Sequence, residues 1–254
     1  MSVVLPRVEV TRYVTPLREG GSLPGVMEAD DLGTYVVKFR GAGQGLKSLV
    51  AEVIAARLAR ALELPVPDLV VASLDPGFAA GEPDEEVQEL LRASAGDNLG
   101  VDFLPGALDA GPAAVERGAD PDFAGRLLWF DAYVNNVDRT WRNPNMLWWH
   151  SGLQLIDHGA TLTFHHHWPT AADAVTRPFD ARNHVTDAAH PDLRSAEAFA
   201  VPRLGADVLT AALEDVPDGW LNLENTWGTA TQVRAGYVDW LRERLAARSA
   251  WTPR

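Results

Sequence analysis

The chain has 254 residues, of which 46% are hydrophobic and 22% charged, the composition of a folded protein with one or two domains. Its 22 basic and 35 acidic residues give a formal net charge of −13, which argues against a general nucleic-acid binder and against attachment to an anionic membrane surface. The sequence contains no cysteine, which excludes disulfide bonds, thiolate metal sites and a cysteine nucleophile.

The N-terminal residues lack the pattern of a targeting segment. Residues 1–12 mix Pro6 with charged side chains and lack the apolar core of about 7–15 residues that a signal peptide requires. The sequence also has no run of about 18 apolar residues, the length that a membrane-spanning helix needs. We therefore expect a cytoplasmic protein whose direct partners include neither a membrane nor nucleic acid.

The first hundred residues are expected to be rich in β-strands. Segments of β-branched and aromatic residues alternate with turns and with a Gly/Pro-rich connection at residues 20–25. One long helix is expected, with Ser48 as its N-cap and Pro65 as its stop, and a second, charged helix is expected to end at Gly96. The expected strands cover residues 8–16, 26–28, 34–39, 69–74 and 99–104, and the expected helices cover 48–64 and 82–95.

The rest of the chain is expected to be mainly helical. Helices are predicted over residues 122–136, 205–213 and 229–248, and a hairpin turning at His150-Ser151-Gly152 joins strands 146–149 and 153–156. The inward face of the last helix is predicted to consist of Val233, Tyr237, Trp240, Leu241 and Leu245.

The change in pattern falls between Leu104 and Ala110. We therefore predict an α+β fold with a β-rich, nucleotide-binding part over residues 1–105 and a mainly helical, catalytic part over residues 106–254, together forming one domain.

Lys38 is the first residue with a candidate chemical role. The chain has 20 Arg and only 2 Lys, and Lys38 lies in the expected strand at residues 34–39. The lysine amine is a compact point charge that suits a phosphate oxygen, whereas arginine is a planar fork. Glu52, on a helix face of otherwise small residues, could pair with this amine and orient it. The alternatives are a solvated lysine on an edge strand and an ordinary solvated helix carboxylate.

The polar loop at residues 135–145 carries the strongest signal. It places Asp138, Asn143 and Asn145 between a predicted helix and a predicted hairpin. Carboxylate and amide oxygens are the ligands that magnesium prefers, and a carboxylate beside a hydroxyl can orient it and accept its proton. The alternative is a turn whose Asx side chains bond the local backbone.

Asp157 follows the predicted hairpin. Because a hairpin returns the chain to its starting point, Asp157 is expected to lie near Asn143 and Asn145. An acid just after an apolar strand, followed by His158 and Gly159, suits a metal ligand, and the alternative is a plain Asp-His-Gly turn.

Taken in chain order, these residues resemble the protein-kinase-like fold and, most specifically, the HipA-like kinases. Lys38 in Val-Val-Lys-Phe resembles the phosphate-binding strand lysine of that family, and Glu52 resembles its helix partner. Asn136-Val137-Asp138-Arg139, followed by Asn143, resembles the catalytic loop, and Asp157-His158-Gly159 resembles the metal-binding Asp-Phe-Gly of kinases. The resemblance extends over residues 8–165, in the order the family requires.

The sequence also departs from the family pattern. Asn-Val rather than His-Arg precedes Asp138, and Thr140 stands where HipA proteins usually carry histidine. Gly20 to Gly25 has the composition of a phosphate-covering loop without the G-x-G-x-x-G spacing. The chain is also shorter than the full-length HipA toxins.

The resemblance implies a two-lobed, ATP- and Mg2+-dependent kinase that acts on a Ser/Thr hydroxyl of a protein. Asp138, Lys38 and Glu52 would be the catalytic residues, and Asn143 and Asp157 would hold magnesium, with Asn145 as an alternative ligand. The implied nucleotide-binding residues are Lys38 together with Gly20, Gly21, Ser22, Asp102, Phe103 and Leu104.

Several alternatives stay open at this point. The site could bind nucleotide without transferring phosphate, as in a pseudokinase, or it could act on a lipid or a small-molecule hydroxyl. The implied partners are ATP, an unknown protein substrate and an antitoxin-like protein. Arg139 and Arg142 would either steady the transferred phosphate or pair with local acids, and residues 165–167, three consecutive histidines, would form a polar surface stretch or a metal site.

Overall fold

A computed structural model describes residues 5–17, 23–221 and 228–253, which belong to two compact units. The first, here the barrel unit, comprises Val3–Leu49 and Pro67–Pro105, and the second, here the helical unit, comprises Val50–Val66 and Gly106–Arg254. The fold is mixed α+β, as predicted. The helical unit also includes residues 50–66, which the sequence analysis grouped with the β-rich part.

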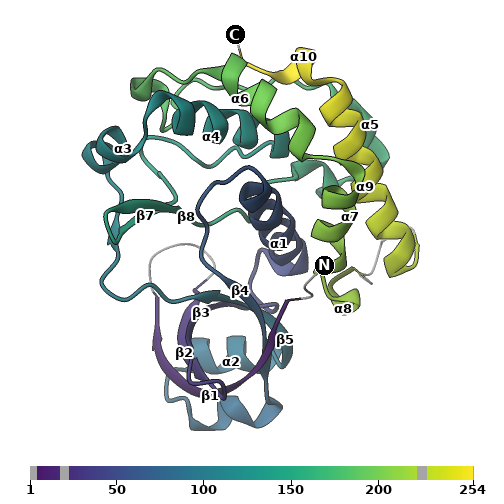
Figure 1. Ribbon diagram of the computed structural model, residues 1–254. Helices are drawn as coiled ribbons and strands as arrows, with labels where there is room; N and C mark the ends of the chain where they lie inside the picture. Colours follow the sequence, from purple (N-terminus) through teal and green to yellow (C-terminus); the bar gives the residue numbers. More distant parts are fainter. Residues whose placement is uncertain (1–4, 18–22, 222–227, 254) are drawn as a thin grey trace. The chain divides into compact units, whose positions relative to one another are not determined.

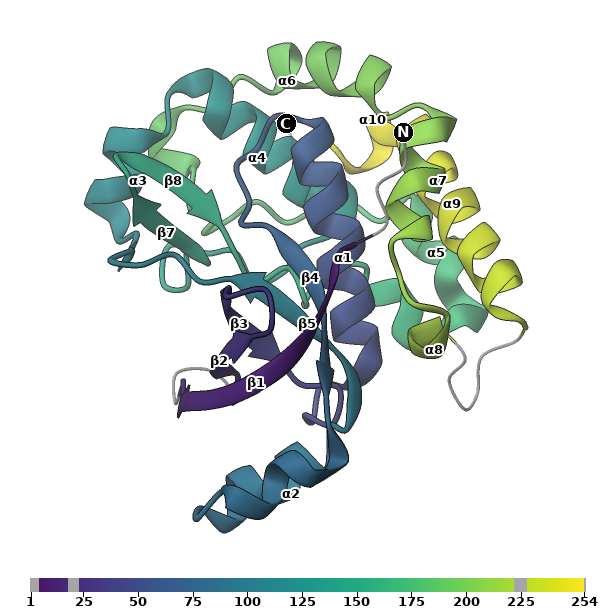
Figure 2. The ribbon, with the colours of Figure 1, turned by 60° about the horizontal axis from the view of Figure 1, so that its bottom comes forward.

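The barrel unit is built on a closed five-stranded barrel (Figure 1). Its strand order is β1-β2-β3-β5-β4, and the parallel pairing of β1 with β4 closes the ring, whereas the other neighbours are antiparallel. The strands are β1 (Arg7–Pro16), β2 (Gly25–Ala29), β3 (Thr34–Lys38), β4 (Leu69–Leu74) and β5 (Gly96–Asp102). A 3-10 turn, η1 (Pro76–Gly81), and helix α2 (Glu85–Ala93) connect β4 to β5 (Figure 2).

Alternating side chains of the strands fill the barrel core. Val8, Val10, Met27 and Val37 are buried there, as the period of two along a strand requires. The five predicted strands are confirmed, with small shifts at their ends. Gly96 begins β5 with φ +98° rather than ending α2.

Helix α1 (Gly45–Ala61) differs from its prediction at both ends. Ser48 is not the N-cap: it lies inside the helix, and its hydroxyl donates to the Gln44 side chain at 3.2 Å. Pro65 is not the stop either. The helix ends because Glu63 adopts a left-handed conformation, φ +56°, and the Leu64 amide folds back onto the Ala59 carbonyl at 2.9 Å.

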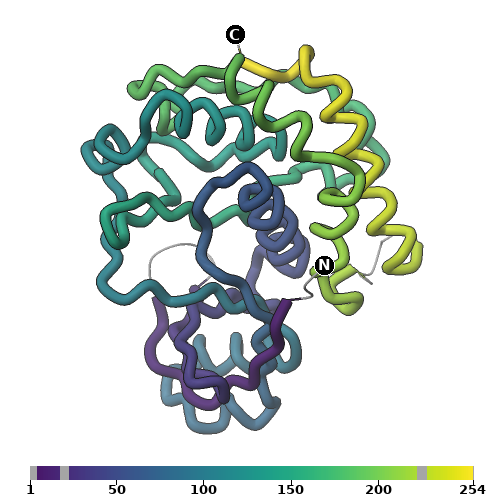
Figure 3. Tube along the Cα trace, viewed as in Figure 1, coloured from purple at the N-terminus to yellow at the C-terminus, as the bar shows by residue number. Residues whose placement is uncertain are grey.

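The helical unit contains α1 from Val50 onward, a small sheet and the helices that follow residue 111. Figure 3 traces the path of the chain through them. The sheet has the order β6-β7-β8 and consists of β6 (Leu108–Asp109), β7 (Met146–Trp149) and β8 (Gly152–Leu155). The helices are α3 (Pro112–Gly118), α4 (Pro121–Val134), α5 (Ala171–Val175), α6 (Leu193–Ala200), α7 (Ala206–Glu214), α8 (Asp218–Leu221), α9 (Ala230–Ala246) and α10 (Arg248–Trp251). Short 3-10 turns are η2 (Thr163–His166), η3 (Trp168–Thr170), η4 (Asp187–Ala189) and η5 (Val201–Arg203).

The predicted hairpin and the three predicted helices of this unit are confirmed, and α3, α5, α6, α8 and α10 were not predicted. In the hairpin, His150 and Ser151 form the turn with positive φ angles, whereas Gly152 already belongs to β8. None of the helices in the described ranges is long and apolar enough to cross a membrane.

Arg244 organises the core of the helical unit. The prediction placed Leu245 on the inward face of α9, but Leu245 is half-buried and Arg244 is fully buried. Its guanidinium donates to the Ala132 and Tyr133 carbonyls at the end of α4, and to the Ala174 and Val175 carbonyls at the end of α5. It therefore adds donors to carbonyls at the C-termini of two helices, and burial lowers the pKa of Arg244 to about 10.

Candidate functional site

The Asp138 carboxylate lies on an exposed loop immediately after α4. Asn135 ends the helix in a left-handed conformation, φ +54°, which turns the chain into the loop. Both Asn143 and Asn145 donate their side-chain amides to Asp138 Oδ2, each at 3.0 Å. Because the amide nitrogens face the carboxylate, each amide oxygen points elsewhere and keeps its capacity to accept. The structure therefore brings together three of the predicted site residues.

Asp131 was not among the predicted site residues, but it binds the start of this loop through hydrogen bonds from Asn136 and Arg139. Its carboxylate is fully buried and accepts hydrogen bonds from Asn136 at 2.8 Å, from Arg139 Nε at 2.8 Å and from His184 Nε2 at 3.0 Å. Asn136 in turn accepts the Asp138 backbone amide at 3.1 Å. Asp131 thus connects α4, the Asp138 loop and the segment around His184.

The charge state of this cluster follows from its contacts. Burial raises the pKa of Asp131, but the Arg139 charge and the hydrogen bonds from His184 and Asn136 outweigh it and leave that pKa below its usual value. The Thr186 amide donates to His184 Nδ1 at 3.3 Å, so Nδ1 is an acceptor and Nε2 is the nitrogen that donates to Asp131. The cluster is therefore a carboxylate paired with the Arg139 guanidinium and hydrogen-bonded to the His184 ring.

The hairpin brings Asp157 back toward the loop. Met146 pairs with Leu155 in the β7–β8 ladder, and the Ile156 amide donates to the Asn145 carbonyl at 3.0 Å. Asp157, the next residue, is exposed and has φ +55°. The backbone at Asn145 therefore lies beside the backbone that leads into Asp157, as expected for a hairpin.

Glu52 holds the residues that follow Asp157. Its side chain is only 5% exposed, and Oε1 accepts the Gly159 amide at 2.9 Å. Its Oε2 lies 3.7 Å from His158 Nδ1. Burial lowers the pKa of His158, and the nearby Glu52 carboxylate counteracts this only partly. Glu52 is therefore not a solvated helix carboxylate, and its position in α1 fixes the Asp157-His158-Gly159 turn.

The other predicted nucleotide-binding residues belong to the barrel unit or lie outside the described residues. Lys38, half-buried, ends β3 opposite Leu99. The Asp102 amide donates to the Asp68 carbonyl at 2.8 Å, and the Phe103 amide donates to the Thr34 carbonyl at 3.0 Å. Both amides therefore already have backbone acceptors within the barrel unit. Gly20, Gly21 and Ser22 lie outside the described residues.

The structure also bears on the alternatives left open for Arg139, Arg142 and the three consecutive histidines at residues 165–167. Arg139 pairs with a local acid, because Asp131 holds it in full burial. Arg142 is exposed and stacks on the Trp141 ring, with its Cζ 4.7 Å from the ring centroid. Residues 165–167 are not a uniform surface stretch: His165 is fully buried, and its Nδ1 lies 2.9 Å from the Tyr237 hydroxyl.

The donor chemistry of the loop fits magnesium. Asn143, Asn145 and Asp157 offer amide and carboxylate oxygens, which are hard ligands, and magnesium usually takes few protein ligands because water and phosphate complete its coordination. The described residues contain no group of three or more His, Asp or Glu placed to hold a metal by themselves.

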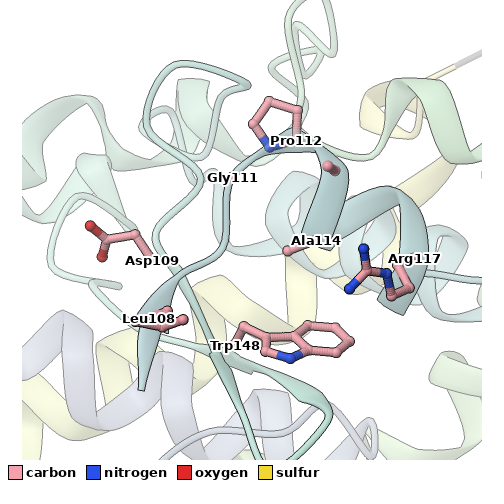
Figure 4. Close-up of a pocket in the computed structure, with 8 residues that line it drawn as sticks. Leu108, Asp109, Gly111, Pro112, Ala114, Arg117 and Trp148 are labelled. Carbon is pink, nitrogen blue, oxygen red and sulfur yellow. The ribbon is translucent and has the colours of Figure 1, made fainter. Parts of the chain in front are cut away.

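A surface pocket of about 400 Å3 lies elsewhere in the helical unit (Figure 4). Leu108 and Asp109 of β6, the start of α3, and Trp148 of β7 line it, with the Arg117 guanidinium 6.0 Å from the Trp148 ring centroid. None of the predicted site residues contributes to its lining.

Comparisons with known proteins give the family and the fold of the chain. The family model of HipA-like kinases matches residues 10–252. Among solved structures, the chain is similar to the Helicobacter pylori proinflammatory kinase CtkA, with 12% sequence identity, a TM-score of 0.57 and coverage of 96% of this chain and 98% of that chain. At this identity the likeness establishes a shared fold. Comparison with curated proteins gave no match. The chain belongs to the HipA-like kinases.

Proposed function

We propose that this kinase transfers the γ-phosphate of ATP, with Mg2+, to a Ser or Thr hydroxyl of a protein. The observation that carries the proposal is the Asp138 carboxylate, exposed but held by the amides of Asn143 and Asn145 at the entrance of the hairpin that leads back to Asp157. A preorganised acceptor beside oxygen ligands is what in-line phosphoryl transfer needs, because the chemistry relies on positioning and electrostatic stabilisation.

In this proposal Asp138 receives the substrate hydroxyl. As the hydroxyl oxygen forms its bond to the γ-phosphorus, the bond from phosphorus to the bridging oxygen breaks and ADP leaves with that electron pair. The hydroxyl proton passes to the Asp138 carboxylate and then to solvent. Asp131 contributes indirectly, because it fixes the loop through Arg139 and Asn136.

Asn143 and Asp157 would hold magnesium, with Asn145 as the alternative amide ligand. When bound, the ion supplies positive charge that offsets the charge on the transferred phosphate. Glu52 supports this role by holding Gly159, two residues after Asp157.

The residues of the barrel unit would bind the nucleotide. Lys38 would contact its phosphates, as the family resemblance implies. The 102–104 segment would contact adenine through groups other than the amides of Asp102 and Phe103, which donate to Asp68 and Thr34. Gly20, Gly21 and Ser22 remain candidate phosphate contacts. A cytoplasmic location and an antitoxin-like protein partner belong to the same proposal.

Incubation with ATP labelled at the γ-phosphate, in the presence of Mg2+ and candidate protein substrates, tests this function. We expect label on protein with the wild type and a loss of at least about a hundredfold with Asp138→Asn or Asp157→Asn, which preserve shape and remove charge. Asp207→Asn, an exposed acid in α7, is the matched control and is expected to retain transfer.

Two other outcomes would replace the proposal. Nucleotide binding without transfer to any acceptor would identify a pseudokinase. Transfer to an added small alcohol or lipid, but to no protein, would identify a kinase that acts on small molecules. Equal transfer by the wild type and Asp138→Asn would show that Asp138 does not receive the hydroxyl.

A further inference from the structure

The loop that carries Asp138 also exposes apolar surface. Val137 is 62% exposed and Trp141 is 49% exposed, although both are large apolar side chains. The described residues expose few such side chains, and the others are Val14, Leu32 and Leu108. Exposed apolar groups that gather at one place mark interaction surfaces, and tryptophan is enriched among the residues that dominate binding energy.

The position of this surface is fixed by a tight turn. The Thr140 amide donates to the Asn143 carbonyl at 3.0 Å and the Asn143 amide donates to the Thr140 carbonyl at 3.1 Å, which puts Trp141 and Arg142 at the tip. The Trp141 amide also donates to the Asn183 carbonyl at 3.1 Å. Asn143 ties the turn to Asp138 through its side chain. These hydrogen bonds therefore hold the tip close to Asp138.

Arg142 gives this surface a charge preference. It is exposed, stacks on Trp141, and makes no ion pair with an acid among the residues that the structure describes. Its neighbour Arg139 is the opposite case, since Asp131 neutralises it in the core. On a chain with a net charge of −13, Arg142 is thus an exposed cation whose charge is available to a partner at the Asp138 loop.

We propose that Val137, Trp141 and Arg142 form a docking surface for the protein substrate, here the 137–142 surface. It takes a segment with an apolar side chain, which packs on Val137 and Trp141, and a Glu or Asp side chain, which pairs with Arg142. Stacking on Trp141 holds the guanidinium in place for this ion pair. The inference rests on the proposed phosphotransfer to a protein and adds the chemistry of the residues next to the accepting Ser or Thr.

Fluorescence anisotropy with labelled peptides tests the 137–142 surface. The probe is a short Ser-centred peptide with Leu and two Glu, and its controls replace Glu by Lys or Leu by Ala. We expect the Glu/Leu peptide to bind the wild type at least about fivefold more tightly than either control. A chain with a net charge of −13 attracts cationic peptides in general, so its overall charge would favour the Lys peptide. Tighter binding of the Glu/Leu peptide therefore cannot come from the overall charge.

Variants then locate the effect. Arg142→Glu is expected to reverse the preference between the Glu and Lys peptides, and Trp141→Ala to weaken the Glu/Leu peptide about tenfold, with Trp141→Phe restoring part of the loss. Arg194→Glu is the charge-matched control, because Arg194 is exposed on α6, and Leu108→Ala is the apolar control. Both controls are expected to bind like the wild type.

The outcomes that overturn the proposal are distinct from those that overturn the kinase function. Absence of binding, equal binding of Glu and Lys peptides, or equal effects of Arg142→Glu and Arg194→Glu would each overturn the 137–142 surface. ATP binding, measured in parallel, is expected to be unchanged in the Trp141 and Arg142 variants. Peptide selectivity in a protein that fails to transfer phosphate would instead contradict the proposed function while leaving the surface in place.

Discussion

Asp131 shows how one buried residue can control an exposed site. The carboxylate has no contact with solvent, yet its three donors come from the helix end, the Asp138 loop and the segment around His184. A buried charge of this kind is tolerated only because it is paired and fully hydrogen-bonded. Through these contacts Asp131 holds the start of the Asp138 loop against α4 and the segment around His184.

The pKa of Asp131 predicts a dependence of stability on pH. Because this pKa is lower in the folded state than its usual 3.8, Asp131 stabilises the fold above about pH 3.8. That contribution is lost as the pH falls through the lowered folded value. We expect Asp131→Asn to reduce the free energy of unfolding by about 3–5 kcal/mol at pH 7, since it leaves Arg139 without its charge partner.

Denaturant unfolding from pH 7 to pH 3 checks this prediction. The wild type is expected to lose stability more steeply than Asp131→Asn below about pH 4, so that the two curves converge. Parallel curves over the whole range would contradict the assignment of this acid-sensitive contribution to Asp131.

At the scale of elements, α4 is the helix on which the site depends. The Asp138 loop begins where α4 ends. The N-terminus of α4 lies against the start of α6, where the Asp192 amide donates to the Pro121 carbonyl at 3.2 Å. Gly125 permits this approach: a Cβ there would lie 2.5 Å from the Asp192 carbonyl oxygen. The Asp192 carbonyl belongs to the backbone, so it cannot rotate away from an added Cβ as a side chain could.

Substitution of Gly125 is therefore expected to destabilise the protein although alanine favours helices. We expect Gly125→Ala to reduce the free energy of unfolding by about 1–3 kcal/mol through overpacking, which exceeds the gain in helix propensity of about 1 kcal/mol. Gly43→Ala is the control, because a Cβ there meets no atom within 4 Å. Thermal unfolding of both variants makes the comparison, and a stabilised Gly125→Ala would contradict the close approach.

For the whole molecule, nucleotide should act as a stabilising ligand. If ATP and Mg2+ bind the folded chain, a free ligand concentration of a hundred times Kd is expected to raise the free energy of unfolding by about 2.7 kcal/mol. Asp157→Asn is expected to abolish the part of this rise that requires Mg2+, whereas Asp207→Asn is expected to keep it. Thermal shift with ATP, with and without EDTA, measures both, and an EDTA-insensitive shift in the wild type would argue against a metal at Asp157.

Local patterns were sufficient to predict much of the fold. The barrel strands followed from their β-branched content, and the 146–156 hairpin from two short apolar runs around a turn. Asp138, Asn143 and Asp157 were predicted as site residues because polar residues cluster where regular elements end, and the structure places the Asn143 amide on the Asp138 carboxylate. Asp131 also had a signal, as an acid on the apolar face of a predicted helix, four residues after Leu127.

Other features required the tertiary structure. The sequence by itself determined which segments form strands and helices, and which polar residues occupy the loops, because these depend on neighbours along the chain. It did not determine that Arg244 caps two helices, that Glu52 holds Gly159, or that His184 reaches Asp131 from 53 positions away. These contacts exist because folding brings distant backbone groups together, and a buried polar side chain must then find its partners wherever the packing has placed them.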